Sequence, residues 1–320
     1  MTLNRRTLLK QTLAAGVAAG SPPFFPAAAQ STTRKAPFTV DLCPGNIGVK
    51  ADPGAVIALA HQYGFESVQP NADYLAKLDA VRLRELLAEL AANKLVWGAA
   101  GLSVEFRGDE ATFRGGMDGL PKLAAALQDA GAKRVGTWIK PYHESLTYSA
   151  NFKQHAVRLR EVARVLGDHG LRFGLEYVGT RTLWTKSRHS FIHTMAEARE
   201  LIAEIGQPDL GLVLDSWHWF TAQETAEDIL ALKNHDVVAC DLNDAPTGIA
   251  VEDQLDNQRE LPASTGVINI QAFLNALVEI GYDGPVRAEP FNKPLNAMED
   301  GPAAEATAKS IRKAMEIAGV

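Results

Sequence analysis

Four acidic side chains in the second half of the chain each follow a short apolar run. They are Glu176 in "GLEYVG", Asp215 in "GLVLDSWHWF", Asp241 in "VVACDLND" and Glu289 in "PVRAEPF". A carboxylate at such a position must be paired, hydrated or ligated, because burying it alone costs several kcal/mol. If the four runs end at one edge of a sheet, the carboxylates favour a shared divalent cation.

Other polar and aromatic residues lie beside these acids and allow two interpretations. His218 follows Asp215 by three positions, and Trp217 and Trp219 flank it, so the three form a candidate pocket wall beside a carbohydrate. The structural alternative makes His218 a satisfied buried polar residue and the two tryptophans core packing residues. Asp215 and Asp244 are equally suited to capping a following helix. Clustering on consecutive strands favours metal ligation over these separate explanations.

The elements that must position these residues are eight short β-like runs that alternate with amphipathic helical segments. Eight β-then-α units with apolar strands predict a parallel sheet covered on both sides, which we interpret as a closed (β/α)₈ TIM barrel forming one domain. An open doubly wound sheet is the alternative, although the chain lacks its glycine-rich nucleotide motif. In a barrel the C-terminal strand ends converge at one mouth, where the four acids would meet. The predicted strands are residues 38–42, 66–70, 95–102, 133–139, 172–178, 210–215, 237–244 and 285–291.

The first part of the chain has the pattern of an export signal. Arg5 and Arg6 precede a short apolar stretch without acidic residues, and "AAAQ" offers a cleavage site after Ala29. The arginine pair resembles the signal of the twin-arginine machinery, which exports folded proteins. We therefore expect residues 1–29 to be a signal peptide, residues 37–320 to form the barrel, and the mature protein to be periplasmic. A retained membrane anchor is the alternative, but the apolar stretch is short.

Charge and cysteine content limit the partners. Removing the signal leaves 29 basic and 38 acidic side chains, a net charge of −9. This balance argues against a nucleic-acid-binding protein, since phosphate neutralisation requires a basic surface. Cys43 and Cys240 are the two cysteines. An oxidising compartment would permit a disulfide between them, whereas the alternation along "VVACD" favours a core position for Cys240.

From Phe38 to Val320 the sequence resembles the xylose-isomerase-like TIM-barrel superfamily, in its sugar (and sugar-phosphate) isomerase/epimerase branch. The resemblance implies a metal held by a Glu, an Asp, a His and a Glu from strands five to eight. Glu176, Asp215 and Glu289 match this pattern, whereas Asp241 stands where the family has histidine. An all-carboxylate site is expected to favour Mn²⁺ or Mg²⁺ over Zn²⁺.

The resemblance also implies substrate contacts. His218 matches a histidine that contacts substrate rather than metal, with Trp217 in the pocket wall. Arg259, in "DNQRELPASTG", resembles a basic residue that reaches substrate hydroxyl or carboxylate groups. The alternative for Arg259 is a surface ion pair with Asp256 or Glu260.

The implied activity is a metal-dependent isomerase or epimerase acting on a carbohydrate. A divalent metal stabilises the enediolate formed when a proton leaves the carbon beside a carbonyl, and Glu176 and Glu289 would abstract and return that proton. Elimination from a 3-oxo-glycoside is an alternative on the same barrel, and a non-catalytic exported sugar-binding barrel is an alternative of a different class. A homo-oligomer is compatible with the sequence.

Overall fold

The computed structural model describes residues 35–320. The predicted signal peptide, residues 1–29, lies outside the described residues. None of the described helices is both long enough and apolar enough to cross a membrane.

A single nine-stranded parallel sheet forms the centre of the fold, and it confirms the predicted barrel. Its order is β3-β2-β1-β11-β10-β9-β7-β5-β4. All eight predicted strands are present, because β3 and β4 are two pieces of one predicted run. The bounds are β1 Thr39–Leu42, β2 Ser67–Val68, β3 Val96–Trp97, β4 Ala99–Gly101, β5 Arg134–Trp138, β7 Arg172–Glu176, β9 Leu210–Asp215, β10 Val237–Leu242 and β11 Pro285–Ala288.

The sheet closes at Gly98. β3 pairs with β2 and β4 pairs with β5, so the two ends of the sheet are consecutive pieces of one segment. A Cβ atom at Gly98 would lie 2.3 Å from Oδ1 of Asp41, and glycine is therefore required where the chain passes this carboxylate. The open doubly wound alternative is wrong, since such a sheet would leave two separate edges.

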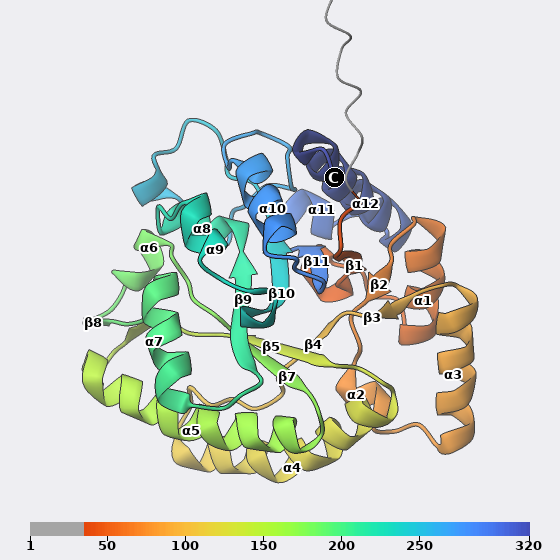
Figure 1. Ribbon diagram of the computed structural model, residues 1–320, viewed down its shortest axis with the longest axis horizontal. Helices are drawn as coiled ribbons and strands as arrows, with labels where there is room; N and C mark the ends of the chain where they lie inside the picture. Colours follow the sequence, from red (N-terminus) through yellow and green to blue (C-terminus); the bar gives the residue numbers. More distant parts are fainter. Residues whose placement is uncertain (1–34) are drawn as a thin grey trace, which may run out of the picture. The chain divides into compact units, whose positions relative to one another are not determined.

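Helices follow the strands and lie on their outer side, as α1, α3, α4, α5 and α7 show in Figure 1. A small antiparallel pair, β6 (Tyr142–His143) and β8 (His189–Ser190), joins two loops. The helices are α1 Pro53–Gln62, α2 Ala72–Leu75, α3 Ala80–Ala92, α4 Glu110–Asp129, α5 Tyr148–Asp168, α6 Arg181–Trp184, α7 Met195–Ile205, α8 Ser216–Thr221, α9 Ala226–Leu230, α10 Ile270–Glu279, α11 Lys293–Asn296 and α12 Asp300–Ala318, with short 3₁₀ turns η1 Pro44–Ile47, η2 Asn234–Asp236 and η3 Val251–Asp253.

Local sequence explains where these elements begin. Aspartates 52, 79 and 109 precede α1, α3 and α4, and each accepts backbone N–H groups of the first helical turn. Every residue of β9 and β10 is buried, as expected for strands covered on both faces. Asp215 ends β9 and also caps α8, because its Oδ1 accepts the Trp217 N–H at 2.7 Å. The strand end and the helix start thus share one acidic residue.

The two cysteines are buried free thiols, so the disulfide alternative is wrong for this structure. Cys240 lies in β10 and is fully buried, which confirms its predicted core position. Burial raises the pKa of the Cys43 thiol to about 12. Both side chains therefore stay protonated and act as small apolar residues.

Candidate metal and active site

The four predicted acidic residues all lie at the C-terminal mouth of the barrel. Glu176 ends β7, Asp215 ends β9, and Asp241 lies near the end of β10. Glu289 follows β11 directly. Asp241 and Asp215 are register partners on neighbouring strands, so their side chains start side by side. The barrel thereby brings together residues that are more than 100 positions apart in the chain.

These acids form two overlapping groups with the spacing that metal ligands need. The oxygen atoms of Glu176, Asp241 and Glu289 lie within 4.8 Å of one another. Glu176 also forms such a group with Asp215 and His218. Within the described residues, no single group of this spacing holds all four acids. Three of the four predicted ligands are thus close enough to share one ion, and Asp215 lies in the second group, which also contains Glu176.

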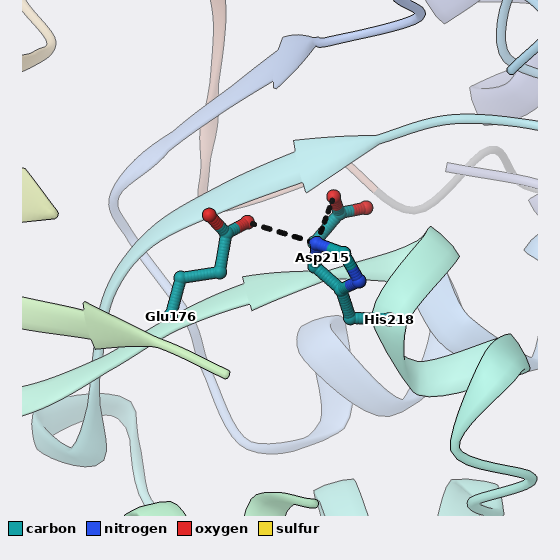
Figure 2. A group of neighbouring side chains, drawn as sticks. All are labelled: Glu176, Asp215 and His218. Carbon is teal, nitrogen blue, oxygen red and sulfur yellow. Dashed lines mark ion pairs between the residues drawn. The ribbon is translucent and has the colours of Figure 1, made fainter. Parts of the chain in front are cut away.

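His218 lies among the predicted ligands (Figure 2). Its Nε2 is 3.7 Å from Oδ2 of Asp215 and 4.0 Å from Oε1 of Glu176. Burial, with Arg259 nearby, lowers the pKa of His218 to about 3, so the ring is neutral at pH 7. A neutral imidazole can ligate a metal or bind a substrate hydroxyl. The structure therefore allows a metal role for His218 beside the substrate role predicted from sequence.

Arg259 places a buried positive charge among these acids. Its Nη1 is 2.7 Å from Oδ2 of Asp215 and 3.2 Å from Oε2 of Glu289, and its Nη2 is 3.0 Å from Oδ1 of Asp256. The pair with Asp256 that we considered from the sequence is present. It is not a surface pair, however, because Arg259 is only 3% exposed. Arg259 is thus a component of the site.

The prediction that Trp217 lines the pocket wall needs correction. Trp217 is fully buried, and its Nε1 donates to Thr180 at 2.9 Å. The guanidinium carbon of Arg259 lies 5.4 Å from the Trp217 ring centre, so this tryptophan packs behind Arg259. Phe291 lies over Arg259 at 4.6 Å with 39% of its surface exposed, in a left-handed backbone conformation with φ 42°. The exposed aromatic residue beside Arg259 is therefore Phe291.

Arg287 is a site residue that the sequence analysis missed. Its Nε and Nη2 contact the two carboxylate oxygens of Asp241 at 2.6 and 3.1 Å. Asp241 is therefore held by an arginine from the neighbouring strand. A signal existed, because Arg287 and Glu289 in "VRAEPF" are two positions apart, and alternation on a strand places them on one face.

A further buried acid, Asp41, lies near this pair. Asp41 is 1% exposed, and neither carboxylate oxygen has a hydrogen-bond partner within the described residues. Burial raises the Asp41 pKa to about 6, although the positive charge of Arg287 partly opposes this. The register of β1, β11 and β10 puts Asp41 in the same layer of the barrel as Asp241, so this layer holds a further carboxylate without a hydrogen-bond partner among the described residues.

Burial and mutual repulsion raise the pKa values of the mouth carboxylates. Burial and then Glu289 raise the pKa of Glu176 well above its usual range. Burial raises the pKa of Glu289 to about 8, with Asp241 adding repulsion, and that of Asp215 to about 7 although Arg259 opposes the rise. Oε1 of Glu176 is buried and has no hydrogen-bond partner in residues 35–320. A divalent cation would satisfy this oxygen and offset the excess negative charge, so the residues present fit such a group.

A family model described as xylose isomerase-like TIM barrel matches residues 57–316. The chain belongs to this family. Of the solved structures, the xylose isomerase domain protein from Alicyclobacillus acidocaldarius is 29% identical, with a TM-score of 0.76 over 88% of this chain and 99% of that one. The IolI protein with a bound zinc atom has a TM-score of 0.72 over 87% of this chain and 98% of that one, and at 18% identity it supports the fold alone.

Curated members of the family with detectable sequence similarity are enzymes. Inosose isomerase from Halalkalibacterium halodurans is 26% identical over 136 residues, 42% of this chain and 44% of the relative. 3-Dehydroshikimate dehydratase from Pseudomonas aeruginosa is 28% identical over 141 residues, 43% and 21% of the two chains. Ketose 3-epimerase from Arthrobacter globiformis is 25% identical over 193 residues, which are 59% of this chain and 60% of the relative. The chain thus spans less than half the length of the first two relatives.

Asp244 has a structural role, but not the helix-capping role that we considered for it. Its carboxylate accepts backbone N–H groups from Ala245, Thr265, Gly266 and Ile268 at 2.7–3.0 Å. These contacts hold the loop between β10 and α10 in place. The acid therefore anchors a loop of this family member and does not cap the start of a helix.

Proposed function

We propose that this protein is a divalent-metal-dependent isomerase or epimerase that moves a proton at a carbohydrate carbon next to a carbonyl group. The observation that carries the proposal is the group formed by Glu176, Asp241 and Glu289, whose carboxylate oxygens approach within 4.8 Å at the barrel mouth. Similarity to an inosose isomerase and to a ketose 3-epimerase supports the reaction class and a carbohydrate substrate.

Glu176 and Glu289 are the proposed proton carriers. They project from β7 and β11, and their oxygens lie close enough to approach one substrate carbon from two sides. Efficient general bases have pKa values near the working pH. The raised pKa values of both residues in the metal-free protein move them in that direction, and a bound cation would lower them again. One residue removes the proton and the other returns it.

A divalent cation held by these carboxylates would supply charge stabilisation for two neighbouring substrate oxygens. Arg259 would hold the orientation of Asp215 and Glu289 through its two Nη1 contacts. Neutral His218, with Nε2 directed toward Glu176 and Asp215, would orient a substrate hydroxyl.

The metal ligands are tested by comparing two single variants. We propose that Glu176, Asp215, Asp241 and Glu289 ligate the ion and that the all-oxygen set selects Mn²⁺ or Mg²⁺. Asp241→Asn is then expected to weaken metal affinity roughly tenfold or more, measured by isothermal titration with Mn²⁺. His218→Asn should leave metal affinity unchanged and lower turnover. The reverse result would assign the ion to the group that contains His218.

The reaction is tested by proton exchange in D₂O. Purified protein is incubated with ketohexoses, inositols and 3-oxo-glucosides, with EDTA or with added Mn²⁺. We expect metal-dependent deuterium incorporation at a carbon beside a carbonyl, with an isomer or epimer as product. Exchange that EDTA does not affect would contradict the metal role. Sugar binding without exchange or turnover would leave a non-catalytic sugar-binding barrel as the function.

Elimination is the second candidate, because one relative is a 3-dehydroshikimate dehydratase. The same proton removal beside a carbonyl would be followed by loss of a leaving group from the next carbon. Release of the aglycone from a 3-oxo-glucoside in the same assay, without epimer formation, would favour this lyase over the isomerase.

We further propose that the protein is exported to the periplasm by the twin-arginine machinery. Replacing both Arg5 and Arg6 by lysine is expected to keep the precursor inside the cell, whereas Lys10→Arg, which preserves charge outside the pair, should not. Cell fractionation and the N-terminal sequence of the mature protein would measure this. A mature chain that retains residues 1–29 at the membrane would favour an anchor instead.

A further inference from the structure

A pocket of about 420 Å³ lies beside the carboxylate mouth, over the ends of β4 and β5. Trp138 is the register partner of Glu176, and the N–H of Ile139 donates to the backbone oxygen of Glu176 at 2.8 Å. The pocket and the proposed active site therefore share a wall at Trp138. The lining residues that matter here are Glu105, Arg107, Trp138, Lys140, Asn151 and His155.

Two buried acceptors in this pocket lack partners. Asn151 and His155 are 2% and 3% exposed, and no described residue forms a hydrogen bond with Oδ1 of Asn151 or Nε2 of His155. Nδ1 of His155 donates to the backbone oxygen of Asn151 at 2.9 Å, which leaves Nε2 as the acceptor of a neutral ring. Burial lowers the His155 pKa to about 4, so the ring stays neutral at pH 7. Unpaired buried acceptors of this kind are rare in native proteins.

The packing around His155 fixes the direction of its ring. Phe106 meets it edge-on with ring centres 5.4 Å apart, and Phe191 lies at 4.8 Å on another side. The unpaired Nε2 is thus held in one orientation within the pocket wall. A ligand that donates a hydrogen bond there would meet a preformed acceptor.

The charged side chains of the pocket do not form an anion site. Nε and Nη2 of Arg107 contact Glu105, and its Nη1 donates to the backbone oxygen of Trp138. Nζ of Lys140 lies 4.4 Å from the ring centre of Tyr142. With Glu144, the two acids and two bases that line the pocket cancel in charge. The Arg107 guanidinium is therefore already engaged, and the pocket has no net positive charge that would favour a phosphate or carboxylate.

We propose that this pocket is a subsite for a second, neutral sugar ring, so that the substrate is a disaccharide or a glycoside rather than a single sugar. The inference rests on the proposed function, since the first ring would occupy the carboxylate mouth. Hydroxyl groups donate to Asn151 Oδ1 and His155 Nε2. Trp138, 42% exposed, offers an aromatic face to the C–H groups of the ring.

The test follows His155 directly by NMR of the purified full chain with ¹⁵N-labelled histidine. The probes are cellobiose, maltose and trehalose, with glucose, glucose 6-phosphate and sodium sulfate for comparison. At least one disaccharide is expected to shift the unprotonated Nε2 signal of His155 and to bind more tightly than glucose. Glucose 6-phosphate should bind no more tightly than glucose, and sulfate should not shift the signal. If no disaccharide shifts it, or if sulfate does, the subsite proposal is overturned.

Variants separate the acceptor role from packing. His155→Phe is expected to weaken disaccharide binding about three- to tenfold, the size of one hydrogen bond, and His155→Gln should restore part of it. His169→Gln is the matched control. His169 makes the same Nδ1 contact to a backbone oxygen four residues earlier, and it does not line this pocket. Equal affinity of His155→Phe and the unmodified protein would contradict the proposal.

Two further results keep the proposal testable on its own. If His155→Phe does not fold, the exposed Trp138→Leu is expected to weaken disaccharide binding by a larger factor than glucose binding. Proton exchange in D₂O is read separately from the NMR shift. If deuterium exchange occurs but no disaccharide shifts the His155 signal, only the subsite proposal is rejected. A disaccharide-dependent shift without exchange defeats only the proposed reaction.

Discussion

At the ends of β7, β9, β10 and β11 the barrel mouth holds an excess of acidic side chains, whereas the pocket at the ends of β4 and β5 has balanced charges and two neutral acceptors without partners among the described residues. On the charged side, Arg259 and Arg287 use their nitrogens to hold acids in fixed positions. On the neutral side, Asn151 and His155 leave acceptors unpaired. Charge that is held in place suits a metal and proton transfer, while neutral acceptors suit recognition of hydroxyl groups. The comparison is consistent with the two proposals, in which the carboxylates carry out proton transfer and the neighbouring pocket selects the substrate.

The largest expected effect comes from replacing the proposed proton carriers at the carboxylate mouth. Glu176→Gln and Glu289→Gln should each lower the rate of deuterium exchange about 10²–10⁴-fold, because each removes a proton carrier. Glu224→Gln is the matched control, because Glu224 is a half-buried acid that contacts Tyr177 and the N–H of Met195 outside the ligand groups. It should keep nearly the full rate. Similar rates of deuterium exchange in all three variants would contradict the proposed catalytic role of Glu176 and Glu289.

The next effect concerns the ion pair between Arg287 and Asp241. Arg287→Met is expected to lower the free energy of unfolding by about 3–5 kcal/mol, since it leaves a buried carboxylate unpaired. Adding Asp241→Asn to this variant should recover part of the loss. Urea denaturation of the metal-free proteins would measure both. A loss below about 1 kcal/mol in the single variant would show that Asp241 is protonated or hydrated without Arg287.

The pH dependence of stability follows from the raised pKa values of Asp215, about 7, and Glu289, about 8. Because the folded state holds these protons more tightly than the unfolded state, the metal-free protein should lose stability as pH rises through these values. Between pH 6.5 and 8 we expect these two groups to lower the free energy of unfolding by roughly 2–3 kcal/mol, measured by urea denaturation with EDTA. The depressed pKa values of His155 and His218 act only below about 6.5. Added Mn²⁺ should reverse the loss, and a stability that rises over this window would contradict the carboxylate assignment.

The smallest effect sharpens the contrast between the two arginine environments. Arg107→Met on the neutral side should cost only about 0.5–1 kcal/mol of unfolding free energy. The Arg107 side chain is 18% exposed and stacks between Phe106 and Trp138. Its partner Glu105 is half-exposed, so water can hydrate this carboxylate when Arg107 is replaced. If Arg107→Met and Arg287→Met lower the free energy of unfolding equally, the two arginines do not differ in how strongly they stabilise their acidic partners.

The closed barrel could be predicted because its signals are local. Each strand shows as a short apolar run, and the run "VVACDL" remains buried throughout β10. The acids Glu176, Asp215, Asp241 and Glu289 could be assigned to one mouth because parallel strands in a barrel end on the same side. The predicted role of Trp217 was wrong, because helical geometry in α8 turns its side chain toward Thr180 and the core. Sequence spacing alone does not report such a rotation.

By itself the sequence determined the order of eight βα units and the acids that follow their strands, since alternation and strand ends are properties of short segments. Only the tertiary structure decided which of those acids share a neighbour, that Arg287 pairs with Asp241, and that Asn151 and His155 face the same pocket as Trp138. These relations join segments far apart in the chain. They depend on side-chain direction and on the depth at which each charge is buried, and both are set when the barrel closes.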